Sequence, residues 1–276
     1  MFSVSLFILG LFVGSFLNVL ADRIPKGESP IRGRSRCDKC KKILKWYDLI
    51  PLFSFIFLKG KCRYCQTRLS LFYPTVEFVT GTLFFITAIF VLNDSQFPLL
   101  GGQAISNFQF PINYQLPITL IYYLFIVSSL IVVFFADLKY GIIPDKIVFP
   151  AIAVSFLYLF INPSSLILNH LLSAVGACLF FLLLFVITKG RGMGFGDVKF
   201  AFLMGLILGF PDIVVGLYIA FLTGAIVGCI LIIWRKKRIF GTAIPFGPFL
   251  VMGTLMSIFY GSLIFQKFLQ VLDLHW

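Results

Sequence analysis

The chain has 276 residues, of which 59% are hydrophobic and 35 are Phe, and its formal net charge is +12. Its mean hydropathy is +1.00. A soluble domain of this size could not bury that much apolar surface, so the composition excludes one and indicates that lipid surrounds most of the chain. We therefore expect an all-α polytopic membrane protein.

Eight segments are apolar over most of the length that a membrane-spanning helix needs, which is about 20 residues. The first could be mistaken for a signal peptide, but its basic residues follow the apolar run instead of preceding it, so we expect a retained span. The sixth is short and ends at Pro211. The expected spans are 3–20, 72–92, 117–136, 146–162, 169–188, 198–210, 213–234 and 246–266.

Basic residues are distributed very unevenly between the loops. Eight spans that start outside leave four inner loops, 21–71, 137–146, 189–199 and 235–243. These loops hold 13, 2, 3 and 4 Lys or Arg residues, together 22 of the 23 in the chain. Because Lys and Arg resist translocation, this pattern predicts an outside amino terminus, and the net charge is mainly a topology signal. We expect contact with anionic lipid and no nucleic-acid partner.

Four of the six cysteines form two pairs inside the loop 21–71. The pairs are "CDKC" (Cys37, Cys40) and "CRYC" (Cys62, Cys65), separated by 21 residues. Two such pairs can close a tetrahedral four-thiolate site, and zinc accepts four thiolates without strain. Disulfides are the weaker alternative in a loop that faces the reducing cytosol. We expect structural zinc in a small cytosolic domain that otherwise lacks a core.

Histidine is nearly absent from this chain. His170 and His275 both fall at outer ends of expected spans. This placement removes Ser–His, Cys–His and HExxH chemistry from the inner face, and carboxylates remain as the candidate catalytic groups there.

Three aspartates lie at the cytosolic ends of expected spans. Asp145 follows Pro144 and precedes an apolar run, so we expect it to be a helix N-cap. Asp197 could likewise cap the sixth span or lie in its first turn. Asp137 lies at the carboxyl end of a span, where the helix dipole disfavours an anion, which makes it the better candidate for function.

Two glycines precede Asp197 in the run "GFGD". Without side chains, Gly194 and Gly196 would let a substrate chain approach the acid. A second acid on a neighbouring span would complete an aspartyl dyad, in which the carboxyls share a proton, one deprotonating water and the other protonating the scissile carbonyl. The dipoles suggest that Asp197 is the ionised member and Asp137 the proton holder.

Several motifs along the chain resemble those of type IV prepilin peptidases, membrane aspartyl proteases with a GxGD signature. The resemblance extends almost from end to end. It is carried by "GSFLNVLADRIP" (14–25), "SRCDKC", "DLIPLFSF", "GKCRYC", "YPTVEF", "ADLKYGIIPD", "GFGDVK" and "IPFGPFL" (244–250).

The resemblance implies a catalytic pair, Asp137 and Asp197, that removes the short basic leader from type IV prepilins or pseudopilins. Family members with the cysteine domain also methylate the new amino terminus with S-adenosylmethionine, and this chain is of that longer kind. Glu77 in "YPTVEF" is then a candidate for the methyl-transfer site or for docking the zinc domain. Its alternative is a first-turn acid or a partner for a basic side chain.

These observations divide the chain into a first span (1–20), a cytosolic four-cysteine domain (21–71) and a membrane peptidase domain (72–276). The competing function is a transporter or assembly factor whose acids carry ions and whose zinc domain binds partners. Acids at the membrane edge favour the enzyme over a transporter. A methyltransferase without cleavage is a third possibility, although both aspartates are present.

Overall fold

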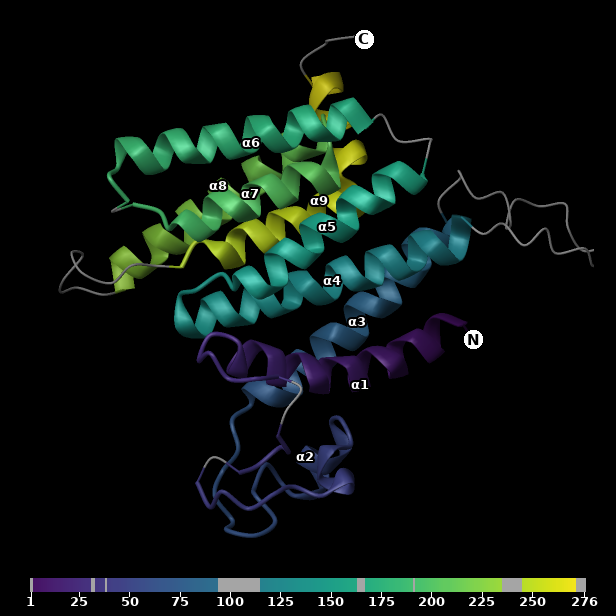
Figure 1. Ribbon diagram of the computed structural model, residues 1–276, viewed down its shortest axis with the longest axis vertical. Helices are drawn as coiled ribbons and strands as arrows, with labels where there is room; N and C mark the ends of the chain where they lie inside the picture. Colours follow the sequence, from purple (N-terminus) through teal and green to yellow (C-terminus); the bar gives the residue numbers. More distant parts are fainter. Residues whose placement is uncertain are drawn as a thin grey trace, which may run out of the picture. The chain divides into compact units, whose positions relative to one another are not determined.

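A computed structural model describes residues 2–30, 33–37, 39–93, 115–162, 167–190, 192–234 and 245–271 (Figure 1). The chain divides into two compact units, Met1–Val132 and Val133–Trp276. Most of the expected outer loop 93–116, the whole of the inner loop 235–243 and His275 lie outside the described residues.

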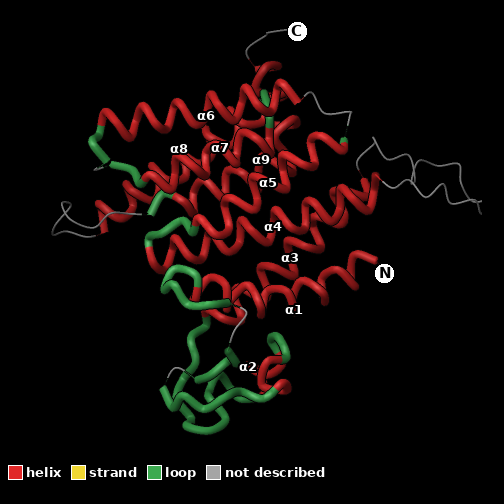
Figure 2. The backbone as a smooth tube through the Cα atoms, viewed as in Figure 1, coloured by secondary structure: helices red, strands yellow, loops and turns green. Residues whose placement is uncertain are grey.

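The first unit contains two long helices and a polar lobe. The helices are α1 (Phe2–Arg23) and α3 (Phe72–Asn93), and the unit also includes the start of α4 (Gln115–Tyr140). The lobe lies between α1 and α3 in the sequence, is mostly loop and turn (Figure 2), and contains a 3₁₀ turn at Trp46–Leu49 and the short helix α2 (Phe53–Phe57). These two short elements were not predicted from the sequence.

Close contact between α1 and α3 depends on small residues. A Cβ atom at Gly10 would lie 2.8 Å from Gly81 Cα, and one at Gly14 would lie 2.8 Å from Glu77 Cα. Glycines spaced by four residues bring two helix backbones together where lipid provides no hydrophobic drive for association. The GxxxG spacing of Gly10 and Gly14 therefore fixes the part of α3 that carries Glu77 against α1.

The second unit is a bundle around α7. It comprises the end of α4 with α5 (Asp145–Ile161), α6 (Ile167–Ile187), α7 (Phe195–Leu208), α8 (Asp212–Trp234) and α9 (Gly247–Val271). Helix α7 packs against α5, α6, α8 and α9, and ten of its 14 residues are buried. Gly205 allows the tightest of these contacts, because a Cβ there would lie 2.5 Å from Ala174 Cα on α6.

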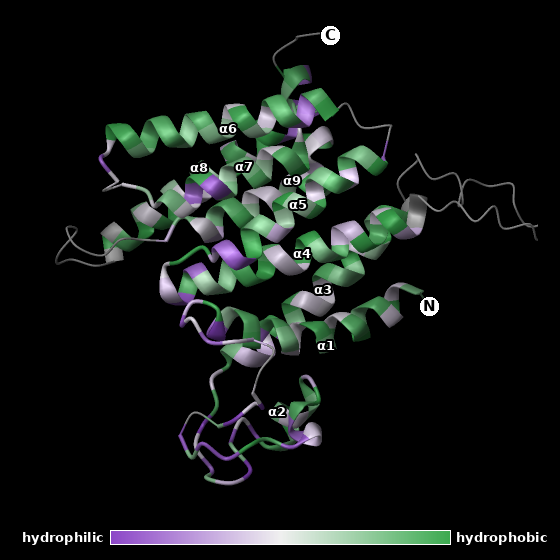
Figure 3. Cartoon of the chain, viewed as in Figure 1, coloured by the Kyte–Doolittle hydropathy of each residue, from purple (hydrophilic) through white to green (hydrophobic). Residues whose placement is uncertain are grey.

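Each of the eight expected spans is helical over most of its length, so the all-α membrane fold is confirmed. Among the described residues, six helices have the length and apolarity to cross a membrane: α1, α3, α4, α6, α8 and α9. Helices α5 and α7 have 17 and 14 residues and are shorter than these. Hydrophobic residues dominate the long helices, whereas the lobe around α2 is largely polar (Figure 3).

Candidate active site and four-cysteine centre

Asp137 and Asp197 come together in the second unit. Asp137 lies in the last turn of α4 and Asp197 in the first turn of α7, as the sequence predicted. Their exposed fractions are 5% and 6%. The two carboxyl groups are near enough to interact electrostatically. Two buried acids from different helices thus lie within electrostatic range of one another.

Each of these carboxylates accepts a hydrogen bond from the backbone of a glycine. Gly194 N–H donates to Asp197 Oδ2 (3.0 Å), and Gly247 N–H donates to Asp137 Oδ2 (2.9 Å). Gly194 is the N-cap of α7, so the Asp197 side chain helps to cap this helix from its first turn. The sequence predicted this structural role as the simplest one for Asp197. Gly247, the glycine of the "IPFGPFL" motif, begins α9 and lies at the site. The sequence did not indicate that this motif contacts Asp137.

The two glycines before Asp197 have different surroundings. A Cβ at Gly196 would lie 3.0 Å from Ile143 Cβ, so this glycine lets α7 start close to the connection between α4 and α5. A Cβ at Gly194 would meet Asp197 Oδ2 at 3.6 Å, an ordinary contact. Close packing therefore explains why residue 196 is a glycine. That Gly194 and Gly196 let a substrate approach Asp197 remains a prediction.

Asp145 does not cap α5, so that prediction was wrong. Pro144 occupies the N-cap position in an extended conformation, which places Asp145 one residue inside the helix, without a side-chain cap hydrogen bond. Lys199 Nζ instead donates to both Asp145 carboxylate oxygens at 2.8 Å. Because Lys199 lies two residues after Asp197, this ion pair ties the starts of α5 and α7 together beside the two buried acids.

We expect the Asp145–Lys199 pair to position α7. Asp145→Asn and Lys199→Met should each slow the expected peptide cleavage by about twofold to fivefold, in keeping with a partly exposed ion pair. The double variant should be no slower than the slower single variant, because both changes break one interaction. Cleavage rates of the three variants test this, and rate losses that multiply in the double variant would contradict a shared role.

His170 lies at the opposite end of α7 from Asp197. Its Nδ1 is 3.0 Å from Leu206 O, and the neighbouring Asn169 Nδ2 donates to Phe210 O (2.8 Å). These contacts fasten the start of α6 to the end of α7. His170 is thus separated from the two acids by the length of α7, as its position in the sequence predicted.

The four predicted metal ligands gather in the lobe of the first unit. The Sγ atoms of Cys37, Cys40, Cys62 and Cys65 all lie within 4.8 Å of one another. Cys37 and Cys65 Sγ are 3.8 Å apart, too far for a disulfide. Tetrahedral Zn–S bonds of about 2.3 Å place sulfurs about 3.8 Å apart. The cluster therefore fits a candidate metal site, whereas Cys178 and Cys229 lie in α6 and α8.

Both cysteine pairs sit in the same kind of hairpin. Cys37 N–H donates to Lys42 O (3.0 Å) and Lys41 N–H to Cys37 O (2.9 Å). Cys62 N–H donates to Thr67 O and Gln66 N–H to Cys62 O, both at 2.9 Å. The residue after each pair, Lys41 or Gln66, has a left-handed backbone, with φ of 56° and 55° respectively. Such φ values are strained for residues other than glycine, so the contacts of the two hairpins must hold them in place.

Polar contacts reinforce the second hairpin. Hydrogen bonds with the side chain and backbone of Thr67 lower the pKa of the Cys65 thiol to about 6. Cys65 Sγ and Thr67 Oγ1 lie 3.4 Å apart. Arg63 Nε also donates to Asp48 Oδ1 (2.7 Å), which links this hairpin to the 3₁₀ turn. A thiol with a lowered pKa supplies the thiolate that a metal ion binds.

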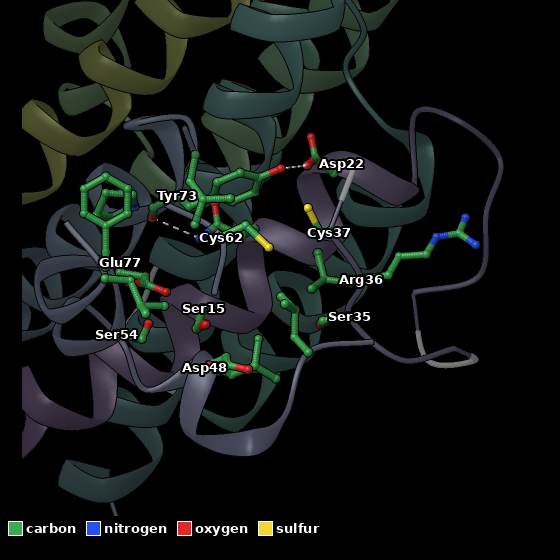
Figure 4. A pocket seen from close by; sticks show the side chains of 18 of the residues that line it. Ser15, Asp22, Ser35, Arg36, Cys37, Asp48, Ser54, Cys62, Tyr73 and Glu77 are labelled. Atoms are coloured by element: carbon green, nitrogen blue, oxygen red, sulfur yellow. Dashed lines mark hydrogen bonds between the residues drawn. The ribbon is translucent and has the colours of Figure 1, made fainter. Parts of the chain in front are cut away.

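Glu77 belongs to the first unit and joins α3 to the lobe. Its Oε2 accepts a hydrogen bond from Leu52 N–H (2.9 Å), and Ser15 on α1 lines the same cavity as Glu77. Leu52 has φ +58°, so Glu77 holds a strained backbone position at the start of α2. This geometry favours lobe docking as a role of Glu77, and the same carboxylate lines a cavity beside the cysteine cluster (Figure 4).

Comparisons with known proteins agree with this arrangement. Residues 8–91 match the family described as "Bacterial Peptidase A24 N-terminal domain", and residues 124–229 match "Type IV leader peptidase family". No solved structure matches the chain.

Three curated relatives carry the name prepilin leader peptidase/N-methyltransferase. The protein of Bacillus subtilis (strain 168) is 31% identical over 96% of this chain and 97% of its own length. That of Myxococcus xanthus (strain DK1622) is 32% identical over 84% of this chain and 64% of its own length. That of Stutzerimonas stutzeri is 27% identical over 95% of this chain and 92% of its own length. The chain is thus a multi-pass membrane protein that belongs to the type IV leader peptidase family, Peptidase A24.

Proposed function

We propose that this protein removes the leader from type IV prepilins or pseudopilins and then methylates the new amino terminus. The observation that carries the peptidase is the pair of buried acids, Asp137 and Asp197, which two different helices bring together. Relatives named as prepilin leader peptidase/N-methyltransferase align over nearly the whole chain. Both activities follow from that family membership.

The two carboxyl groups act as an aspartyl dyad. Like charges this close do not both ionise readily, so the pair holds one proton in the resting state. Asp197 lies at a helix start, where the dipole favours an anion, and deprotonates the attacking water. Asp137 lies at a helix end and donates the proton to the scissile carbonyl. The N–H groups of Gly194 and Gly247 orient one oxygen of each carboxylate.

The distribution of basic residues supports an outside amino terminus and a cytosolic active site. Of the 23 Lys and Arg residues, 22 fall in the four inner loops of an eight-span topology. If α5 or α7 did not cross the membrane, at least one of the basic loops would lie on the outer side. Lys and Arg are preferred in inner loops, so this arrangement is disfavoured. Other helices enclose α7, so most of its surface does not face lipid. A helix in this position can cross the membrane although it is shorter than a helix that lipid surrounds.

The four-cysteine cluster is proposed to hold zinc with a structural role. Four thiolates complete the tetrahedral coordination of zinc and leave no open position for catalysis. The metal stabilises the lobe 21–71, which is poor in buried apolar residues. We expect the peptidase to work without a catalytic metal.

The methyl donor is proposed to be S-adenosylmethionine. When bound, such a donor supplies a methyl carbon that an uncharged amine attacks while the carbon–sulfur bond breaks toward sulfur. Glu77, Gly194 and Gly196 are the proposed substrate-binding residues. Membrane lipid helps association, because enzyme and prepilin share one bilayer and their effective concentration is raised.

The test is cleavage of a purified prepilin by the purified protein in lipid, with product masses recorded with and without S-adenosylmethionine. The expected product lacks the leader and gains about 14 Da, the mass of one CH₂, only when the donor is present. An uncut prepilin would support the transporter or assembly-factor alternative. Methylation of a pilin that is supplied already cut, without cleavage of the full prepilin, would support a methyltransferase alone.

Replacing one metal ligand should remove the metal. Cys62→Ser is expected to lower bound zinc from about one equivalent to near zero and to destabilise the lobe, because three ligands rarely retain a structural ion. Elemental analysis of the purified variant measures this. Cys178→Ser and Cys229→Ser, in α6 and α8, are the matched controls and should retain the metal. Full zinc occupancy in Cys62→Ser would contradict the four-thiolate site.

A further inference from the structure

A cavity of about 300 Å³ lies within the first unit, where α1 and α3 meet the lobe. Ser15 and Asp22 line it from α1, and Tyr73 and Glu77 line it from α3 (Figure 4). Asn18 on α1 is a further lining residue. Ligand sites in proteins occupy about 300–1,000 Å³. The cavity is therefore large enough for a small organic ligand, and it is distinct from the two aspartates, which lie in the other unit.

Asn18, one of the residues that line the cavity, carries a buried polar atom that lacks a partner. Asn18 is 4% exposed, and its Nδ2 donates to Tyr73 O (3.1 Å). Its Oδ1 takes no hydrogen bond within the described residues. The amide orientation follows from the bond to a carbonyl, which only the NH₂ group can donate. A buried acceptor left unbonded costs about 1–3 kcal/mol, so a ligand that donates an N–H or O–H here would gain by binding.

The other walls combine opposite charges with apolar surface. Carboxylates of Asp22 and Glu77 and the basic side chains of Arg23 and Lys26 line the cavity, together with Val19 and Phe55. The Tyr73 hydroxyl donates to Asp22 Oδ2 (3.3 Å). A wall of this kind suits a ligand that carries both charges, several hydrogen-bond donors and one flat apolar part. S-adenosylmethionine has these features in its amino-acid part, sulfonium, ribose hydroxyls and adenine.

The cavity is also bounded by the metal site. Cys37 and Cys62, one from each hairpin, are buried and contribute to its wall. Arg23 donates to Ser29 O, Gly33 O and Arg34 O at 3.2–3.4 Å, which holds the connection before Cys37 against α1. The cavity therefore depends on the metal-stabilised lobe, and so would any ligand bound in it.

We infer that this cavity is the binding site of the methyl donor and that Asn18 Oδ1 accepts a hydrogen bond from it. The inference rests on the proposed methyltransferase function and assigns it a location. It also gives the cysteine cluster a purpose beyond local folding, because the two hairpins form one wall of the donor site.

Binding of S-adenosylmethionine to the zinc-loaded full chain in lipid nanodiscs, measured by calorimetry without prepilin, tests the assignment independently of turnover. Asn18→Leu, which has nearly the same volume, should weaken binding roughly tenfold or more because the buried acceptor is lost. Ser54→Trp, at a wall residue on α2, should block the cavity and abolish measurable binding. Zinc content and melting temperature establish that both variants are folded.

Two matched controls lie outside the cavity. Thr87 is fully buried on α3 and bonds only its own helix, through Leu83 O (2.7 Å), so Thr87→Val is the control for Asn18→Leu. Phe53, 60% exposed beside Ser54, provides the control Phe53→Trp. Both control variants should bind the donor within about twofold of the unaltered protein, since neither changes a wall of the site.

The outcomes separate the assignment from the proposed function. If the unaltered protein binds and uses the donor but the folded Asn18→Leu and Ser54→Trp variants bind it equally well, the cavity is not the donor site and the methyltransferase proposal stands. If the unaltered protein cleaves prepilin but neither binds nor uses the donor, the methyltransferase proposal fails and the assignment fails with it. The assignment would also be overturned if Thr87→Val and Phe53→Trp weakened donor binding as much as Asn18→Leu and Ser54→Trp do.

Discussion

Protein carrying Asp137→Asn or Asp197→Asn is expected to leave prepilin uncut, with a rate at least about 10²–10⁴-fold below that of the unaltered protein. Asparagine keeps the size of the side chain but can neither take a proton from water nor give one to the scissile carbonyl. Each substitution therefore removes one half of the acid–base pair. Cleavage followed by mass spectrometry measures the loss, and zinc content and donor binding report that each variant is folded.

Asp212→Asn is the control for this experiment. Asp212 is a half-buried acid in the first turn of α8, and its carbonyl accepts a hydrogen bond from Ser257 Oγ. It starts the helix that follows the far end of α7, away from Asp197, so its replacement should leave cleavage within a few-fold of normal. If both dyad variants still cut prepilin, Asp197 would be only a helix-start residue and the catalyst would lie elsewhere.

Gly247→Ala should have the second largest effect. The Cβ atom of an alanine at this position would lie 2.5 Å from Asp137 Oδ2 and 3.0 Å from its Cγ. The carboxyl group must move away, and it loses the hydrogen bond from the residue 247 N–H that orients it. Because a displacement of about 1 Å can cost 10²-fold in rate, we expect cleavage to fall by about that factor or more.

The matched control for Gly247→Ala is Gly228→Ala. Gly228 lies in α8, and a Cβ atom added there would enter open space, with no neighbouring atom within 4 Å. Alanine should be neutral or slightly stabilising at this position, because it has the higher helix propensity. Normal cleavage by Gly247→Ala would show that Asp137 does not need this backbone donor, and the "IPFGPFL" motif would then require another explanation.

The membrane architecture could be predicted from the sequence because its causes are local. Apolar runs near the length of a bilayer predict helices wherever they occur, and all eight expected segments are helical. The cysteine cluster could also be predicted from the sequence, because CxxC spacing alone directs two sulfurs at one metal. The short turn and helix at Trp46–Leu49 and Phe53–Phe57 were missed because the lobe has little apolar periodicity to indicate them.

The contacts of the site could not be read from local pattern. Pro144 shifted Asp145 into the helix, where Lys199 became its partner, although 54 positions separate them. The N–H of Gly247 reaches Asp137 across 110 positions. Asn18 received no role from the sequence, and only its burial with one unbonded oxygen distinguishes it.

The sequence by itself determined which segments are apolar helices, six of them long enough to cross a membrane among the described residues, which four thiols can share a metal and that Asp137 lies against the preference of a helix dipole. Hydrophobicity, ligand spacing and helix polarity act over one turn or one span, so neighbouring residues suffice to reveal them. Only the tertiary structure decided that α4 and α7 bring Asp137 and Asp197 together, that Gly247 orients one of them and that Glu77 joins α3 to the lobe. Those contacts depend on how closely separate helices pack, and side chains far apart along the chain decide that jointly.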